Sequence, residues 1–96
     1  EPPDILQLSA GCYEFDGMVL LDDIADMLPL SFGDPEEDTI GGYVFGLLGR
    51  KPEVGDEVRI GGYAFKILKT EGFRVVRVQA TPLAEEPAEQ KDEGDE

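Results

Sequence analysis

The sequence predicts a small α+β domain with the element order ββααβββ, in which two helices pack on a mostly antiparallel sheet. Three observations support this fold class. The chain has 96 residues, which is the size of one small domain. Its first half contains two segments whose apolar residues recur at helical spacing. Its second half contains three segments that alternate apolar and polar residues and are separated by glycine-containing turns, as antiparallel strands are.

The first predicted elements are a hairpin and a short helix. The apolar segments 12–15 and 18–20 flank Asp16-Gly17, and an Asp-Gly pair in this setting is a strong signal for a two-residue type I′ turn. A helix is predicted next, because apolar residues recur at helical spacing at Leu21, Ile24, Met27 and Leu28. Pro29 is expected to end this helix.

A second helix is predicted after an acidic loop, with Thr39 as its N-cap and Gly49 as its terminator. Its apolar stripe comprises Ile40, Val44, Leu47 and Leu48. The helix also contains Gly41, Gly42 and Gly46, and a glycine inside a helix costs about 1 kcal/mol relative to alanine. We therefore expect the helix backbone to approach the sheet closely, which would offset that cost.

Three strands complete the predicted domain. They span residues 57–60, 63–70 and 73–80, with turns at Gly61-Gly62 and Glu71-Gly72 between them. In the last strand the consecutive valines Val75 and Val76 would fall on opposite faces of the sheet. This pattern favours either a bulge or a strand that is covered on both sides.

The foldable body is predicted to span residues 11–80, and residues 1–10 have the composition of a linker. Residues 81–96 contain seven acidic residues, Lys91 and only one large apolar side chain. Such a segment cannot bury enough surface to offset the entropy of ordering, so we predict a disordered acidic tail. Because the chain does not begin with Met, we expect it to be a fragment of a longer protein.

The composition argues against most enzyme classes. The chain has no His, which removes the commonest general base and metal ligand, and its single Cys cannot form an internal disulfide or a Cys-based zinc site. We expect a reducing, cytoplasmic environment and no enzyme activity. The net charge of −14 would be repelled by nucleic acid. No apolar run approaches the roughly 20 residues needed to cross a bilayer, so we expect neither a secretory signal peptide nor membrane insertion of this segment.

Three pairs of segments resemble the C-terminal transporter-associated domain of the CorC/HlyC (hemolysin-like) membrane proteins. They are residues 13–17 with 20–24, residues 39–50 with 52–56, and residues 62–67 with 77–78. The most specific part is the spacing from Thr39 through Gly49 to Pro52 and Gly55. The resemblance implies a fold that is also similar to part of the PCMH-type FAD-binding domains.

The resemblance further implies a function. In the CorC/HlyC family this domain follows a membrane domain and a pair of CBS domains, in proteins linked to magnesium and cobalt efflux. We therefore expect a non-enzymatic regulatory domain without a cofactor, on the cytoplasmic side of the cell membrane. Its expected partners are those upstream domains, and any homo-oligomer would form through the full-length chain. One alternative is a small-molecule binding module for FAD or an adenine nucleotide, and a second is a divalent-metal-sensing module.

The metal-sensing alternative depends on the acidic loop before the second helix. Its carboxylates belong to Asp34, Glu36, Glu37 and Asp38. Carboxylate oxygens are suitable ligands for Mg²⁺ or Ca²⁺, but the spacing does not fit an EF-hand loop. The favoured interpretation is a solvated charged loop.

Three further features have both a functional and a structural interpretation. Gly41-Gly42 at a helix start could hold a phosphate, but no Walker or GxGxxG motif is present, and tight packing is favoured. Asp22 and Asp23 point about 100° apart on a helix, so stabilisation of the helix start is favoured over acid–base catalysis. Cys12 has no basic neighbour in the sequence, which favours an inert buried thiol over a nucleophile.

Basic residues gather in one part of this acidic chain. Residues 59–80 contain five cations against Glu71 alone, which gives a local charge of +4. The cations are Arg59, Lys66, Lys69, Arg74 and Arg77. Two interpretations remain open: a docking face for an acidic partner, a nucleotide or an anionic membrane, or charges that solubilise an exposed sheet and protect its edges.

Overall fold

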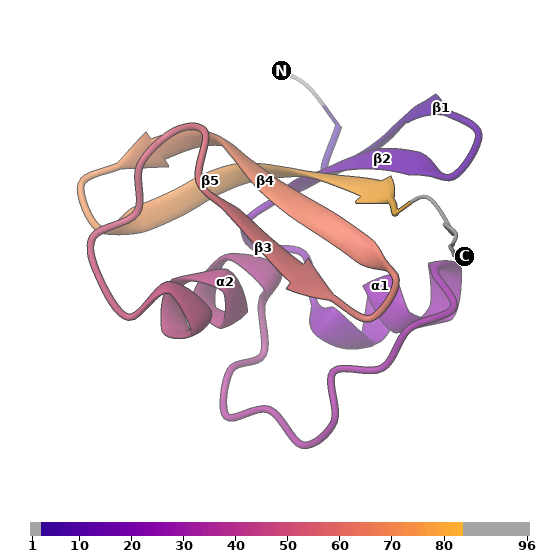
Figure 1. Ribbon diagram of the computed structural model, residues 1–96, viewed down its shortest axis with the longest axis horizontal. Helices are drawn as coiled ribbons and strands as arrows, with labels where there is room; N and C mark the ends of the chain where they lie inside the picture. The colour runs from indigo at the N-terminus through magenta and orange to yellow at the C-terminus, as the bar shows by residue number, and fades with distance from the viewer. Residues whose placement is uncertain (1–2, 84–96) are drawn as a thin grey trace, which may run out of the picture.

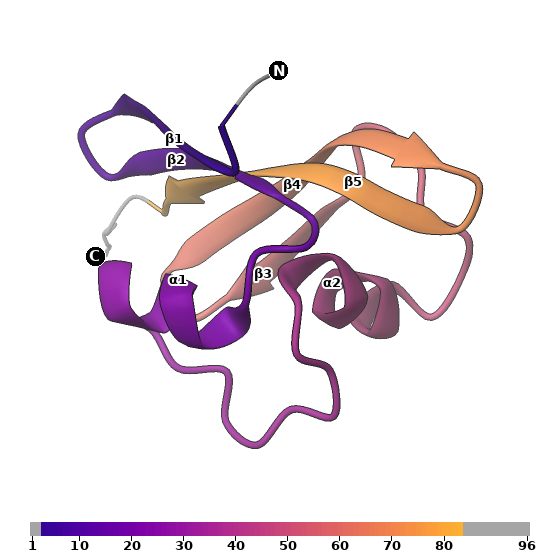
Figure 2. The same cartoon turned by 180° about the vertical axis from the view of Figure 1, so that it is seen from behind.

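The computed structural model describes residues 3–83, which form one antiparallel sheet with two helices on the same face (Figures 1 and 2). The strands are β1 (Ile5–Ser9), β2 (Cys12–Asp16), β3 (Glu57–Ile60), β4 (Tyr63–Glu71) and β5 (Arg74–Pro82), and the helices are α1 (Leu21–Met27) and α2 (Ile40–Leu48). The strands lie in the spatial order β1-β2-β5-β4-β3. The predicted fold class and the element order ββααβββ are confirmed. Neither helix is long and apolar enough to cross a membrane.

The first hairpin differs from the prediction. β2 pairs with β1, in a register that places Ile5 opposite Phe15, and not with residues 18–20. The turn between the two strands contains Gly11, whose φ of 77° is the left-handed conformation that glycine adopts at little cost. The prediction of a linker over residues 1–10 is therefore wrong for residues 5–9, which form an edge strand of the sheet.

Asp16-Gly17 directs the chain from the sheet into α1 and does not form a hairpin turn. The side chain of Asp16 accepts a hydrogen bond from the Met18 amide at 2.9 Å, and the Gly17 amide donates to the carbonyl of Val76 at 2.7 Å. The second of these bonds ties Gly17 to β5, and residues 18–20 do not form the predicted second strand of the hairpin. Leu20 makes only an isolated bridge, to Thr39.

Both helices begin and end close to the predicted residues. The Oγ1 of Thr39 accepts a hydrogen bond from the Gly42 amide at 3.2 Å, which is the expected N-cap geometry. Gly49 ends α2 in the left-handed conformation with φ at 68°. Asp22 and Asp23 are exposed in the first turn of α1, which agrees with the structural interpretation of this pair.

The expected close approach of α2 to the sheet occurs at Gly41. Its amide donates to the carbonyl of Gly17 at 2.9 Å, and a Cβ on Gly41 would lie 2.9 Å from the carbonyl oxygen of Val75. Gly42 instead faces the Thr39 side chain and the Glu37 carboxylate. Gly46 would have no neighbouring atom within 4 Å of an added Cβ, so packing does not explain it.

Of the two interpretations of the last strand, a bulge or a strand covered on both sides, the structure shows the bulge. The register of β4 with β5 shifts between Ile67 and Lys69 and again between Lys69 and Thr70, which is opposite Val75. β5 also continues two residues beyond the predicted end of the folded body, because Thr81 and Pro82 still pair with β4. The remaining part of the predicted tail, residues 84–96, lies outside the described residues.

The core lies between the sheet and the two helices. Its largest fully buried side chains are Phe15, Phe65, Ile24, Ile40, Ile67, Val44 and Val78. Leu47 is half exposed, so the predicted apolar stripe of α2 is wrong at this position. No helix of residues 3–83 covers the opposite face of the sheet, which we call the outer face (Figures 1 and 2).

Candidate functional site

The outer face carries charged and polar side chains from β2, β3, β4 and β5. One row of paired residues crosses the whole sheet and consists of Leu6, Glu14, Gln79, Lys66 and Glu57. Phe15 and Phe65, which are adjacent in sequence to members of this row, point into the core. Since side chains alternate along a strand, the row points away from the helices. Its charges alternate in sign between Glu14, Lys66 and Glu57.

Three of the five predicted docking cations are exposed on β3 and β4. Arg59, Lys66 and Lys69 all have accessible side chains, and Arg59 and Lys66 lie on neighbouring strands. Glu57, the residue opposite Lys66, offsets part of this positive charge. Arg74 is exposed at the start of β5, with its Nη1 3.7 Å from Glu71 Oε1. A pair this long and this exposed contributes little to stability.

Arg77 is not an exposed docking residue, which corrects the prediction for this position. Its side chain is only 8% exposed, and its Nε donates to Glu14 Oε2 at 2.7 Å. The Nη1 atom donates to the carbonyl oxygen of Pro3 at 3.0 Å and lies 3.8 Å from Asp16 Oδ2. The Nη2 atom has no hydrogen-bond partner among the residues that the structure describes. Arg77 therefore holds the entering chain and β2 against β5.

The residues that surround Arg77 were not predicted as a site. Glu14 and Asp16 are separated by one residue on β2, which places both carboxylates on the same face. This i, i+2 spacing is a signal in the sequence, but it identifies Arg77 as the partner only once β2 is known to pair with β5.

The acidic loop places its carboxylates in solvent. Asp34, Glu36, Glu37 and Asp38 lie between α1 and α2, and none of them is buried. Within residues 3–83, no three acidic or Cys side chains come together in a way that could hold a metal ion. This arrangement agrees with a solvated charged loop.

The start of α2 has no backbone amide left for a phosphate. The Ile40 amide donates to the Val19 carbonyl at 2.9 Å, and the Gly41 and Gly42 amides donate to Gly17 and Thr39. An anion at this helix start would have to displace those bonds. The packing interpretation of Gly41 is therefore confirmed.

Cys12 is buried on β2, and the hydrogen-bond partners of its sulfur among the described residues are uncharged. Its Sγ lies 3.6 Å from Thr81 Oγ1 and 3.7 Å from Gln79 Nε2. No described basic side chain hydrogen-bonds to this sulfur, so the surroundings agree with an inert thiol.

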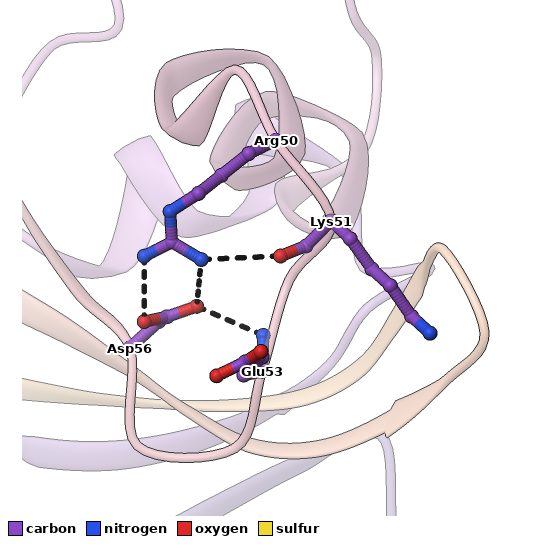
Figure 3. Close-up of polar contacts among 4 residues, drawn as sticks. All are labelled: Arg50, Lys51, Glu53 and Asp56. Atoms are coloured by element: carbon purple, nitrogen blue, oxygen red, sulfur yellow. Dashed lines mark hydrogen bonds and ion pairs between the residues drawn. The ribbon is translucent and has the colours of Figure 1, made fainter.

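An ion pair that the sequence did not indicate fixes the segment between α2 and β3 (Figure 3). Arg50 donates from Nη1 and Nη2 to the two carboxylate oxygens of Asp56, at 3.0 and 2.8 Å. Asp56 also accepts from the Glu53 amide at 2.8 Å, and Nη1 of Arg50 donates to the Lys51 carbonyl. The pKa of Asp56 is lowered, mainly by the hydrogen bonds from the Arg50 guanidinium and next by the hydrogen bond from the Glu53 amide. These bonds hold the loop between Arg50 and Asp56 in one conformation, and we call them the Arg50–Asp56 clamp.

This clamp predicts a specific titration. Because the Asp56 pKa is lowered in the folded chain, the bond stabilises the fold above the ordinary aspartate pKa and is lost as the pH falls through the lowered value. In Arg50→Ala, the pKa of Asp56 should rise toward the ordinary value but remain below it, because the Glu53 amide is retained. An NMR titration of the Asp56 carboxyl carbon measures this change. Identical titrations of the two proteins would contradict the role of Arg50.

Comparison with known proteins identifies relatives over most of the chain. A family model described as a transporter-associated domain, CorC_HlyC, matches residues 6–84. A magnesium and cobalt efflux protein CorC of Vibrio cholerae is 36% identical over 81 residues, which cover 84% of this chain and 28% of that protein. The chain therefore spans less than a third of the length of this relative.

Solved structures have the same fold. A CorC-associated region from Neisseria meningitidis MC58 superposes with a TM-score of 0.78 at 28% identity, over 84% of this chain and 100% of that chain. The transporter-associated domain of a CBS domain protein from Porphyromonas gingivalis superposes with a TM-score of 0.71 at 23% identity, over 84% of this chain and 99% of the other.

Proposed function

Because this chain belongs to the CorC/HlyC family of transporter-associated domains, we propose that it is a non-enzymatic regulatory domain of a membrane protein that transports divalent cations. The proposed cations are magnesium and cobalt, which the name of the Vibrio cholerae relative specifies. The proposed location is the cytoplasmic side of the membrane. The remaining part of the full-length protein would contain transmembrane helices and CBS domains, and the name of the Porphyromonas gingivalis relative supports the latter.

A regulatory domain needs a surface whose contacts differ between the states of the transporter, because only a difference in interaction free energy shifts an equilibrium. We assign this role to the outer face. The observation that supports it most strongly is the position of the entering chain. The Pro3 carbonyl is bound by Arg77, whose side chain lies on the outer face beside Glu14. Pro3, the first described residue, therefore lies on the same face of the sheet as the exposed cations.

The cations of this face would contact an acidic surface of the preceding domains. Arg59, Lys66 and Lys69 supply the positive charge in a chain whose net charge is −14. Exposed ion pairs contribute only about 0–1 kcal/mol each, so the three cations must act together. The resulting coupling would be about 1–3 kcal/mol, which corresponds to roughly 5- to 150-fold in an equilibrium constant. Such a contact adjusts transport without switching it fully on or off.

The test reverses these three charges in the full-length protein. Arg59, Lys66 and Lys69 are replaced by Glu, and cation transport is measured in reconstituted vesicles. We expect a change of at least about fivefold in the transport rate or its cation dependence, given the coupling above. The matched control exchanges Lys for Arg and Arg for Lys at the same positions and should transport normally. Unchanged transport by the Glu variant, with circular dichroism showing an intact fold, would favour charges that serve only solubility.

A further inference from the structure

We infer that the acidic segment 84–96 of this same chain binds the β3–β4 part of the outer face and competes there with the proposed docking partner. The inference rests on the proposed function, since it concerns the regulation of the same surface. Residues 84–96 contain seven acidic residues and only one basic residue, Lys91. Their net charge of −6 is opposite to that of the exposed cations Arg59 and Lys66.

The described chain ends at Leu83, close to the cations that the acidic segment would contact. The Leu83 amide donates to the Gly62 carbonyl at 2.8 Å, so β5 delivers the chain beside the start of β4 (Figure 1). Thr81 lies opposite Ala64, and Ala64 lies opposite Arg59, so these residues share one row across three strands. Neighbouring strands are about 4.8 Å apart, which places Arg59 roughly 10 Å from Thr81 along the row. A few extended residues at about 3.3 Å each span that distance.

The charges of the outer face also indicate which strands the acidic segment contacts. On the β2 side, the carboxylates of Glu14 and Asp16 would repel an acidic segment, although Arg77 neutralises part of their charge. On the β3–β4 side, Arg59 and Lys66 are exposed, and Glu57 is the acidic residue paired opposite Lys66. The acidic segment should therefore lie across β4 and β3 and avoid β2.

Covalent attachment allows weak ion pairs to produce measurable occupancy. A short tether raises the effective concentration of the segment to the millimolar range, so the contact needs little intrinsic affinity. The contact must also depend on salt, because ion pairs on an exposed sheet are screened within about 10 Å at 0.1 M ionic strength. A docking partner with a larger acidic surface would displace the segment.

The experiment locates the segment on the complete 96-residue chain. Cys12 is changed to Ser, Asp95 is changed to Cys and labelled with a nitroxide, and paramagnetic broadening of backbone amides is measured by NMR. The matched control carries the same label, with the other six acidic residues of the segment changed to Gln or Asn. This control keeps the broadening that any tethered label causes by random contact and removes the charge.

We expect the acidic chain to broaden the amides of Arg59 and Lys66 at least about twofold more than the neutral control does, because charge raises the occupancy of the contact. Glu14 should show no such excess, and about 0.5 M NaCl should remove the excess at Arg59 and Lys66. Equal broadening in the acidic and neutral chains, or an excess that survives salt, would overturn the inference. Because the readout involves no transport, a negative result here leaves the regulatory proposal standing, and a failed transport test leaves this contact standing.

Discussion

Replacing Gly17 with alanine should destabilise the domain by about 3–5 kcal/mol, because the new Cβ meets backbone atoms that cannot move independently. A Cβ at this position would overlap the carbonyl oxygen of Val75. The backbone of Gly17 is bonded on both sides, through its amide to Val76 and through its carbonyl to Gly41. Relief of the clash would therefore move residue 17 away from β5 and break at least one of these bonds.

Urea unfolding monitored by circular dichroism measures this effect, and Gly46→Ala provides a matched control. Gly46 lies inside α2 and has no atom within 4 Å of an added Cβ. Alanine there should stabilise the domain by up to about 1 kcal/mol through helix propensity. The two glycine substitutions are thus expected to have opposite signs. Equal stability of Gly17→Ala and the unmodified chain would contradict the described contact between Gly17 and β5.

Replacing Arg77 with alanine should have the second largest effect, a loss of about 2–3 kcal/mol. Removal of one partner from a buried ion pair typically costs about 3–5 kcal/mol, and the lower value allows for the partial exposure of the carboxylates. Glu14 and Asp16 have 20% and 27% of their side-chain surface exposed, and both would lose their cation. The Pro3 carbonyl would also lose its donor, so the start of β1 should become less stable than the rest of the sheet.

The control for this prediction is Arg74→Ala on the same strand. Its side chain is 58% exposed and its ion pair with Glu71 is long, so the change in unfolding free energy should stay within about 0.5 kcal/mol. Hydrogen exchange should show faster exchange in β1 for Arg77→Ala and not for Arg74→Ala. A similar small loss for both variants would mean that the Arg77 cluster does not hold the entering chain.

The sequence was informative where local chemistry determines the structure. Thr39 and Gly49 were predicted as the boundaries of α2, because an N-cap hydroxyl and a left-handed glycine are requirements of the helix itself. The three strands of the second half were predicted for the same reason, since alternation and glycine turns are local signals. Asp16-Gly17 was misleading because its turn is decided by backbone contacts with β5, which lies far away in the sequence.

The candidate site was harder to predict because it depends on register. Alternation assigned Arg59 and Lys66 to an exposed face correctly. The register shift between Lys69 and Thr70 breaks simple alternation along β5, because Val75 and Val78 both face the core although three positions separate them. Burial of Arg77 also requires Glu14 and Pro3, which are 63 and 74 positions away in the sequence.

The central claim is that this domain modulates cation transport by the membrane protein that contains it, and its removal tests that claim most directly. The full-length protein and a variant that lacks residues 3–83 are reconstituted in vesicles, and the flux of Mg²⁺ and Co²⁺ is measured at several cation concentrations. A regulatory domain predicts that the shortened protein still transports, with a rate or cation dependence that differs by at least about fivefold. Identical flux curves for the two proteins, at equal amounts of reconstituted protein, would contradict the claim.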